Sequence, residues 1–361
     1  MNGLQQLINQ LCPNGVEWKT LGEVCEMQRG TSLTKANSIE GEYPVISGGK
    51  EPAFYCNQYN REGETITIAG SGAGAGFVQY WNQKIFVNDA FSMKGSDNLS
   101  VRYLYYCLQN LQEQIYATKK GGGVPHVHIS DVKGFQIPLP PLAIQSRIVE
   151  ILDHFTNLTA NLTAELAQRR KQFEHFREKL LSLDGVEGVE WKKLGDVCDA
   201  KTGSKPNAIL VKGVYKYINA GTTESGFVNQ SNSVGGCVTT PSRGQGGIGF
   251  VAYQLNDFWC GPLCYKLLNK NVNVLLDKYL YYYLSAHNEL ILEYKNEGGT
   301  PALNRKDLLQ IKIHVPPLAV QQSIVNTLDK FTALIENIEL ELALRQKQYE
   351  YYREQLLSFN S

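Results

Sequence analysis

The residues best suited to chemistry in this chain form a glycine-rich run at 70–76, GSGAGAG. The run fits a relaxed Gly-x-Gly-x-x-Ala dinucleotide pattern, but a phosphate cradle needs a strand, a glycine turn and then a helix N-terminus. A β-type run follows at 77–81 instead, and the related segment 242–247 is also followed by a β-type run. The pattern therefore predicts a hairpin or loop at both places and disfavours a nucleotide cofactor. A glycine loop that lets the backbone approach DNA is the alternative.

Short catalytic motifs are absent from the sequence. There is no phosphate-binding Gly-x-x-x-x-Gly-Lys segment, no Asp/Asn-Pro-Pro-aromatic motif for amino methylation, and no acidic pair with a following lysine of the nuclease type. His126 and His128 flank Val127 on a β-like run and so share a face, but no acidic or cysteine ligand accompanies them. We expect no catalytic residue and no metal in this chain, and a structural or DNA-contacting role for the histidines.

Basic and polar residues in glycine-containing loops are the remaining candidates for binding. Such loops lie near 29–35, 119–123, 201–205 and 294–300. Glycine permits close backbone approach, so these loops could contact phosphates or base edges, and a solvated loop is the alternative at each place. The candidate DNA contacts are Arg29, Thr31, Lys35, Lys50, Ser71, Lys119, Lys120, His126, Lys201, Ser204, Lys205, Arg243, Gln245, Lys295, Thr300 and Arg305.

Composition places the chain among globular proteins of two or three domains. The 361 residues are 43% apolar and 19% charged, and the formal net charge is zero. Residues 17–140 carry 11 Lys+Arg against 12 Asp+Glu, and residues 190–316 carry 14 against 10. A DNA-binding function must therefore use local patches, or partners must supply positive surface. No apolar run approaches a membrane span and no leader opens the chain, so we expect a cytoplasmic protein.

The eight cysteines form no pattern typical of zinc or disulfide chemistry. No CxxC pair occurs, and the spacing of Cys260 and Cys264 has no second pair to complete a zinc site. Cys25 and Cys198 occupy equivalent positions in two repeated segments. We interpret the cysteines as small apolar core residues in a reducing compartment.

The chain contains an internal repeat whose unit is about half its length. Residues 16–25, VEWKTLGEVC, return at 189–198 as VEWKKLGDVC, and YLYYCL at 103–108 returns at 279–284 as YLYYYL. The segments between these matches, 26–100 and 199–275, share only a few short sequence matches. Both contain glycine and short β-type runs, so each half is predicted to be a mostly β unit with a helix near 101–116 or 277–294. The tyrosines of these helices are expected in the core rather than on a base-stacking surface.

Two long helices are predicted, at 141–183 and 176 residues further on. Each is opened by a proline pair and carries apolar residues at alternating steps of three and four with one stutter. Two such stripes in one chain are expected to pack on each other, with the helices antiparallel. The residues predicted to pair them are Ile148, Phe155, Leu162, Phe173, Phe176, Ile324, Phe331, Ile338, Tyr349 and Tyr352. Residues 4–11 resemble the tail of such a helix and should pack near the C-terminal end of the second one.

The segments PLPPLAIQSRIVEILDHF and VPPLAVQQSIVNTLDKF, with RRKQFEHFREKLLSL and RQKQYEYYREQLLSF, resemble specificity subunits of type I restriction–modification systems. The resemblance covers the whole chain. It implies an α+β fold with two mostly β target-recognition domains, joined by two long antiparallel helices that form a coiled coil, in a cyclic pseudo-twofold repeat. The expected parts are a first domain at 1–140 with a short helix at 2–11, a spacer at 141–184, a second domain at 185–316 and a spacer at 317–361.

The same resemblance implies a recognition subunit without catalysis or cofactor of its own. Each domain would read one half of a bipartite site on double-stranded DNA, and the helices would set the gap and dock two modification subunits. Those partners use S-adenosylmethionine to methylate adenine at N6, and restriction subunits that use ATP and Mg join the larger complex. The runner-up is a coiled-coil adaptor with two protein-binding β domains, which a DNA shift assay with the modification partner would distinguish.

Overall fold

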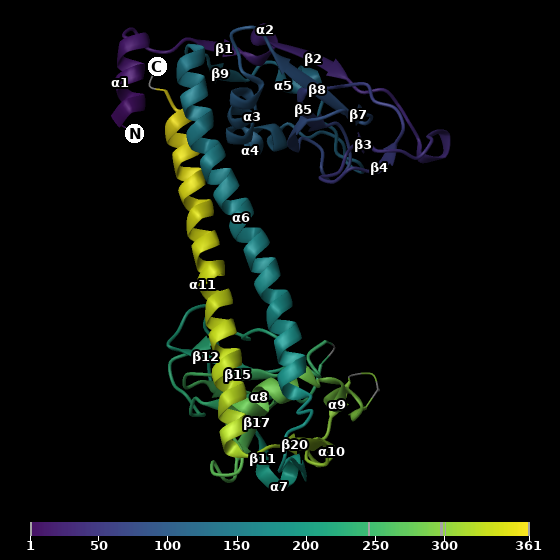
Figure 1. Cartoon of the computed structure of the whole chain (residues 1–361), viewed down its shortest axis with the longest axis vertical. Coiled ribbons are helices and arrows are strands. Elements are labelled where there is room, and N and C mark those ends of the chain that lie inside the picture. The colour runs from purple at the N-terminus through teal and green to yellow at the C-terminus, as the bar shows by residue number, and fades with distance from the viewer. Residues whose placement is uncertain (1, 245, 297–298, 300, 360–361) are drawn as a thin grey trace. The chain divides into compact units, whose positions relative to one another are not determined.

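The computed structural model describes residues 2–244, 246–296, 299 and 301–359. The chain divides into two compact units (Figure 1). Unit 1 comprises Met1–Thr163 and Leu340–Ser361, and unit 2 comprises Ala164–Glu339. Each unit contains a β-rich domain and one half of each of the two long helices.

Unit 1 is built on a four-stranded antiparallel sheet with the order β2-β8-β5-β6, and a smaller sheet with the order β4-β3-β7. A third pair, β1-β9, joins the two ends of the domain. Its elements are α1 (Asn2–Leu11), β1 (Trp18–Thr20), α2 (Leu21–Val24), β2 (Cys25–Arg29), η1 (Lys35–Asn37), β3 (Tyr43–Ile46), β4 (Phe54–Cys56), β5 (Glu64–Ala69), β6 (Val78–Asn82), β7 (Phe86–Val87), β8 (Ala90–Gly95), α3 (Val101–Asn110), α4 (Gln112–Ala117), α5 (Ile129–Val132) and β9 (Gln136–Pro138).

Unit 2 repeats this topology strand for strand. Its sheets have the orders β11-β17-β14-β15, β13-β12-β16 and β10-β20, and a short pair β18-β19 is added. Its elements are β10 (Glu190–Lys193), α7 (Leu194–Val197), β11 (Cys198–Thr202), β12 (Tyr215–Ile218), β13 (Phe227–Val228), β14 (Cys237–Pro241), β15 (Ala252–Gln254), β16 (Trp259–Cys260), β17 (Cys264–Asn269), α8 (Asp277–Ala286), α9 (Glu289–Leu292), β18 (Lys295–Asn296), β19 (Ala302–Leu303), α10 (Arg305–Leu308) and β20 (Lys312–Val315). The scaffold is therefore shared even where the sequence similarity fades.

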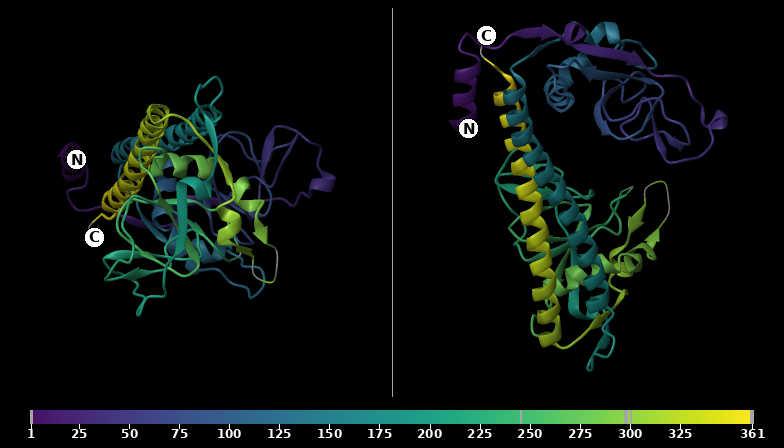
Figure 2. Two further views of the ribbon diagram at one scale, coloured as in Figure 1. Left: turned by 90° about the horizontal axis from the view of Figure 1, so that it is seen from below. Right: turned by 45° about the horizontal axis from the view of Figure 1, so that its top comes forward.

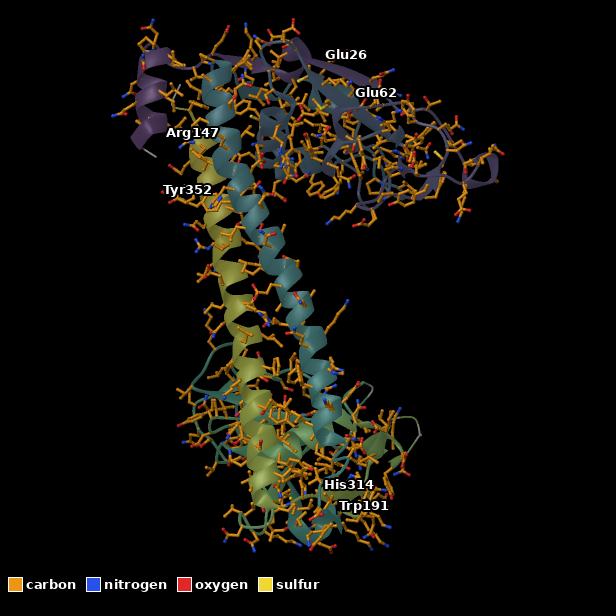
Figure 3. All side chains as sticks on the ribbon, viewed as in Figure 1. Glu26, Glu62, Arg147, Trp191, His314 and Tyr352 are labelled. Atoms are coloured by element: carbon orange, nitrogen blue, oxygen red, sulfur yellow. The ribbon has the colours of Figure 1, made fainter. Side chains whose placement is uncertain are left out.

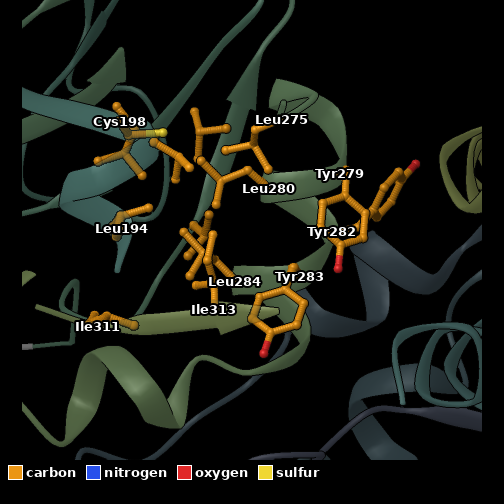
Figure 4. Close-up of a cluster of buried hydrophobic side chains, with 14 of the residues drawn as sticks. Leu194, Cys198, Leu275, Tyr279, Leu280, Tyr282, Tyr283, Leu284, Ile311 and Ile313 are labelled. Carbon is orange, nitrogen blue, oxygen red and sulfur yellow. The ribbon is translucent and has the colours of Figure 1, made fainter. Parts of the chain in front are cut away.

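The tyrosine-rich helices form the core of each domain, as expected. Tyr103 and Tyr106 of α3 are fully buried, and Figure 4 shows Leu280 and Leu284 of α8 packed with Leu194 from the start of the domain. The predicted single helix at 101–116 is wrong in one respect. It breaks at Leu111, which has φ −91° and ψ 4°, and α4 continues from there.

All eight cysteines are free, and six of them are buried. Burial raises the pKa of Cys198 to about 12, and does the same for Cys25 at the equivalent position. These thiols therefore remain protonated at neutral pH, which agrees with a role as apolar core residues.

The two long helices are α6 (Leu142–Leu181) and α11 (Leu318–Leu357), and they run antiparallel (Figures 1 and 2). In unit 1 the ring of Phe155 stacks on Tyr352 with the centroids 5.3 Å apart, and in unit 2 Phe176 stacks on Phe331 at 5.2 Å. The expected first helix is two residues too long at its C-terminal end. Leu183 adopts a left-handed φ of 57° and is buried, so the backbone turns away before it.

The apolar stripe of each long helix serves two partners rather than one. Ile144, Ile148 and Leu152 are fully buried in the core of unit 1, where they pack against the β domain as well as Leu356 and Leu357 of α11. Leu152 and its counterpart Leu328 were not among the predicted seam positions. A seven-residue repeat identifies one face of the helix, and these two residues lie beside that face, in the shared cores of units 1 and 2.

Helix α1 packs beside the C-terminal end of α11, as the sequence predicts (Figure 1). Leu4 is buried in the same cluster as Leu356 and Leu357, with Leu7 and Ile8 packed against it. Unit 1 thus takes core residues from both ends of the chain. Among the described residues, no helix is long and apolar enough to cross a membrane.

Candidate nucleic-acid interface

The glycine run at 70–76 connects β5 to β6, so the hairpin expected there is confirmed. Its backbone amides are used within the domain. Gly76 N donates to Ala69 O at 2.8 Å and Gly72 N donates to Pro125 O at 3.0 Å. A β-carbon on Gly74 would lie 2.4 Å from Gly48 O, so glycine is needed for close approach of the 47–50 loop. The glycine run therefore packs against and hydrogen-bonds to neighbouring loops, and it does not form a phosphate-binding loop.

The glycine turn and the loop at 119–128 hold each other in unit 1. Gly72 N bonds to Pro125 O, and Val127 N donates to Gly70 O at 3.0 Å. Lys120 and His126 exchange backbone hydrogen bonds at 3.0 and 2.7 Å. Two loops that the sequence presented as separate candidates thus form one surface.

We call this pair of hydrogen-bonded loops, the glycine turn and the loop that follows the tyrosine-rich helix, the clasp. Unit 2 contains the same clasp with different side chains. Gly244 N donates to Pro301 O at 3.1 Å and Leu303 N donates to Ser242 O at 2.9 Å. Arg243 pairs with Ala302 in a β-bridge, where unit 1 pairs Ser71 with His126. The predicted contacts Gln245 and Thr300 lie outside the described residues.

A second shared feature is a glycine at the end of the first strand of each large sheet. A β-carbon on Gly30 would lie 2.0 Å from Asn88 O, and one on Gly203 would lie 1.7 Å from Cys260 O. Thr31 N donates to Val87 O at 2.9 Å, and Ser204 N donates to Cys260 O at 3.1 Å. Close approach at these two glycines is thus to protein backbone and not to a ligand, while the flanking side chains Thr31, Lys35, Ser204 and Lys205 are exposed.

Replacing Gly30 by alanine is expected to destabilise unit 1 by about 2–4 kcal/mol, because the new methyl group meets backbone that cannot yield. Denaturant unfolding followed by circular dichroism measures the change. Gly122→Ala is the matched control, since no atom lies within 4 Å of its β-carbon position, and it should change the stability by less than about 0.5 kcal/mol. Equal stabilities for the two variants would contradict the packing described here.

In unit 1 the segment after β2, the connection at 88–89 and the loop at 119–128 line a cavity of about 570 Å³ beside the glycine turn. Arg29, Asp89, His126 and His128 line it, together with the backbone of Gly70. The rings of His126 and His128 lie parallel with centroids 6.0 Å apart, and Ser71 Oγ donates to Asp89. The cavity presents a guanidinium, two imidazoles and a carboxylate, which are groups suited to base edges and phosphates.

Arg61 holds the backbone of Arg29, which lines this cavity, and it was not among the predicted residues. Its Nη2 donates to Arg29 O at 3.0 Å and its Nε donates to Ser92 Oγ at 2.8 Å. Burial lowers the pKa of Arg61 below its ordinary value. Glu26 and Glu62, labelled in Figure 3, line an adjoining cavity of about 380 Å³ with it. An isolated arginine between two strands offers no sequence signal for such a role.

Asn88 and Asp89 were also missed, since both lie in a short connection without periodicity. Asn88 Oδ1 accepts from Leu33 N at 2.9 Å, which fixes the segment after β2. Asp89 O accepts from Gly70 N at 3.0 Å, and its carboxylate accepts from Ser71. Both residues connect the β2 end to the glycine turn.

The other predicted residues of unit 1 contact aromatic rings or acids of their own domain. Lys50 Nζ lies 5.2 Å from the centroid of the Phe77 ring, and Lys119 Nζ lies 4.1 Å from that of Tyr116. Lys120 forms an ion pair with Asp131, and this hydrogen bond holds the pKa of Asp131 below its usual value. The lysine side chain remains largely exposed.

In unit 2, the side chain of Arg305, a predicted DNA contact, bonds to residues of its own domain. Its Nε donates to Ala200 O at 2.6 Å, and it forms an ion pair with Asp199 that lowers the pKa of that carboxyl. Lys201 Nζ lies 4.0 Å from the same carboxylate. Arg243 is exposed beside the glycine turn, and Lys295 is half-buried in β18. In the described part of the chain, no group of three or more His, Cys, Asp or Glu residues is placed to hold a metal ion.

Comparison with known proteins gives a family match over both halves. Residues 13–169 and 186–344 match the type I restriction modification DNA specificity domain. The specificity subunit of the Escherichia coli type I restriction enzyme EcoR124I/EcoR124II is 32% identical over 400 residues, covering 95% of this chain and 94% of that protein. A putative type I restriction enzyme specificity subunit of Haemophilus influenzae is 29% identical, covering 96% of both.

Solved structures show the same fold. The crystal structure of the S subunit of a type I restriction–modification system from M. genitalium superposes with a TM-score of 0.77 at 22% identity, covering 96% of this chain and 98% of that one. A chain from a structural study of complex assembly and conformational transition in a type I system gives 0.56 at 20% identity, covering 95% and 98%. With the family match in both halves and a relative above 30% identity over nearly the whole length, this chain belongs to the family of type I restriction–modification specificity subunits.

Proposed function

We propose that this chain is the DNA-recognition subunit of a type I restriction–modification complex, in which each β domain reads one half of a bipartite double-stranded site. The observation that carries the proposal is one scaffold used twice with different side chains at equivalent places. The bridge between Ser71 and His126 in unit 1 corresponds to that between Arg243 and Ala302 in unit 2. Two such surfaces suit an asymmetric target with two half-sequences.

The cavity in unit 1 supplies the chemistry for direct contact. Arg29 can donate two hydrogen bonds to a guanine edge or a phosphate, and His126 can contact a base edge or a phosphate. Lys50, Lys119 and Lys120 on the surrounding loops are suited to phosphates. In unit 2 we assign contacts to Lys201, Ser204, Lys205, Arg243 and Lys295, with Arg305 supporting the strand that carries Lys201. Because the net charge is zero, partner subunits are proposed to share the DNA backbone.

The proposal divides the chain into a first recognition domain at 1–140, a spacer at 141–184, a second domain at 185–316 and a spacer at 317–361. The spacers set the gap between the half-sites and dock two modification subunits, which bring S-adenosylmethionine and methylate adenine at N6. The target adenine must leave the base stack for such a partner. Restriction subunits with ATP and Mg join through this complex, which acts on DNA in the cytoplasm.

The test begins with sequencing of N6-methyladenine in the host genome, which identifies the bipartite site. Binding of the complex with its modification subunits to that DNA is then measured. Arg29→Ala should weaken binding about tenfold or more and relax specificity at one base of one half-site. Lys19→Ala removes a lysine of β1 that lies outside the cavity, and should leave specificity unchanged. Absence of sequence-specific binding by the wild-type complex would refute the proposal.

A further inference from the structure

A buried glutamine fixes each β domain to its long helix at the same point in both units. Gln145 on α6 is fully buried, and its amide makes three hydrogen bonds: from Ser100 N at 2.9 Å, and to Asn98 O and Pro140 O at 2.8 Å. Gln321 on α11 repeats them, accepting from Leu276 N at 2.9 Å and donating to Val274 O and Pro316 O. The amide is satisfied and inaccessible to water, so it acts as a fixed point.

A second attachment lies two turns further along each helix. In unit 1, Asp153 Oδ1 accepts from Arg102 Nε at 2.8 Å and from the hydroxyl of Tyr106. The same hydroxyl lies 3.3 Å from Thr156 Oγ1. Burial, and then the bond to Asp153, raises the pKa of Tyr106, so the hydroxyl remains a donor.

Unit 2 repeats this attachment 176 residues later. Asp329 accepts from Lys278 Nζ at 2.6 Å and from Tyr282 Oη at 2.7 Å, and Tyr282 Oη lies 3.3 Å from Thr332 Oγ1. We call the carboxylate, cation, tyrosine and threonine of each unit the latch. Its recurrence between α3 and α6 and between α8 and α11 shows that the arrangement belongs to the scaffold and not to the variable surface.

The two latches differ in their cation. The Arg102 guanidinium lies over three rings of unit 1, 4.4 Å from the centroid of Tyr80 and 5.3 Å from those of Tyr105 and Tyr106. Lys278 lies over one ring, 5.7 Å from that of Tyr253. The side chains of Asp153 and Asp329 are each 33% exposed. The latch is thus reachable by solvent, whereas the glutamine is not.

We propose that Asp153 and Asp329 are positioning residues that hold each recognition domain at a fixed angle on the long helices, and so restrict the gap lengths that the complex accepts. Eight residues separate the glutamine from the aspartate on each helix, or about 12 Å. Two polar attachments at that separation, with the buried Ile148 and Leu152 between them in unit 1, fix the orientation of the domain on the helix more closely than the apolar contacts and the glutamine alone. The inference rests on the proposed function, because it concerns the gap between half-sites.

The first measurement uses the full chain in complex with its modification subunits. Affinities are compared for DNA with the native gap and for DNA with a gap one base pair longer. Asp153→Ala should reduce the preference for the native gap about tenfold, the factor expected for one charge-assisted hydrogen-bonded pair. Arg102→Lys recreates the cation of unit 2 and should retain the preference within about twofold. Glu150→Gln removes an exposed ion pair with Arg147 on the same helix, and should have no effect.

The second measurement does not depend on DNA. Noncanonical amino acids that carry spin labels are introduced in place of Glu40 in the domain and Ala160 on α6, and the distance between the labels is measured. Both positions are exposed and both lie in unit 1. Asp153→Ala should broaden the distribution of distances between the labels. An unchanged distribution overturns the proposal, as does an equal loss of affinity for both DNAs, which would indicate a merely structural role. A wild-type complex without gap preference would refute the proposed function, and the spin labels would still show whether the latch fixes the angle.

Discussion

Exchange of residues 26–135 for the equivalent segment of another specificity subunit is expected to change one half of the methylated site and leave the other half unchanged. The segment contains the large sheet of unit 1 beyond the first residue of β2, and both loops of the clasp. Strand β9 and the long helices remain, so the core residues Ile137, Ile144 and Ile148 are retained. Methylation of the original site should fall about 1,000-fold, the low end of the usual ratio between specific and non-specific binding.

The donor segment for this exchange must satisfy the contacts with the helix. It should carry Arg or Lys at position 102, Tyr at 106 and a backbone that reaches Gln145 as Ser100 does. Exchange of 199–311 provides the reciprocal control and should change only the other half-site. Sequencing of N6-methyladenine measures both. A change in both halves, or in neither, would contradict the assignment of one half-site to each domain.

Four-residue insertions made in both long helices are expected to lengthen the gap by one or two base pairs. The aromatic stacks explain why both helices must change. Phe155 and Phe176 are 21 residues apart on α6, and their partners Tyr352 and Phe331 are also 21 residues apart on α11. Insertion after Ala164 and after Leu342 adds about 6 Å to each helix while nearly preserving its apolar stripe.

Insertion in α6 alone is the control for this experiment. It would move one stack out of register, which costs about 0.5–1.5 kcal/mol for the aromatic pair in addition to the lost apolar burial. Thermal unfolding should therefore show a lower melting temperature for the single insertion than for the double one. Genome methylation gives the gap. An active double insertion with an unchanged gap would show that the helices do not set the spacing.

The repeat, the helical periodicity and the proline pairs were sufficient to predict the two long helices and the buried tyrosines. These signals are local, since each depends on residue types at fixed steps along one segment. The C-terminal end of the first long helix was predicted two residues too late. Leu183 has a left-handed backbone conformation, which leucine rarely adopts, so its residue type does not indicate the end of the helix. Leu152 and Leu328 were missed since a helix with two partners has two apolar faces, and the heptad pattern describes one.

The candidate interface was predicted as separate loops, and its assembly required the structure. The turn at 70–76 meets the loop at 119–128, and three strands and two helices separate them in the sequence, so nothing in either segment indicates the other. The loop at Gly30 was predicted either to approach DNA or to be solvated, and the space beside this glycine is filled by Asn88 O. Arg61 and Asn88 act through individual hydrogen bonds, such as those from Arg61 to Arg29 O and from Leu33 N to Asn88, which leave no periodic signal in the sequence.

The presence of Leu4, Leu356 and Leu357 in one buried cluster has a consequence for synthesis on the ribosome. Unit 2 is one continuous stretch of chain, Ala164–Glu339, whereas unit 1 is interrupted and is completed by Leu340–Ser361. At about 5–20 residues per second, the closing segment of unit 1 is made roughly 10–35 s after Thr163. Throughout that interval the nascent first domain presents the apolar side of α1 and the first turns of α6 without Leu356 and Leu357, a surface suited to molecular chaperones.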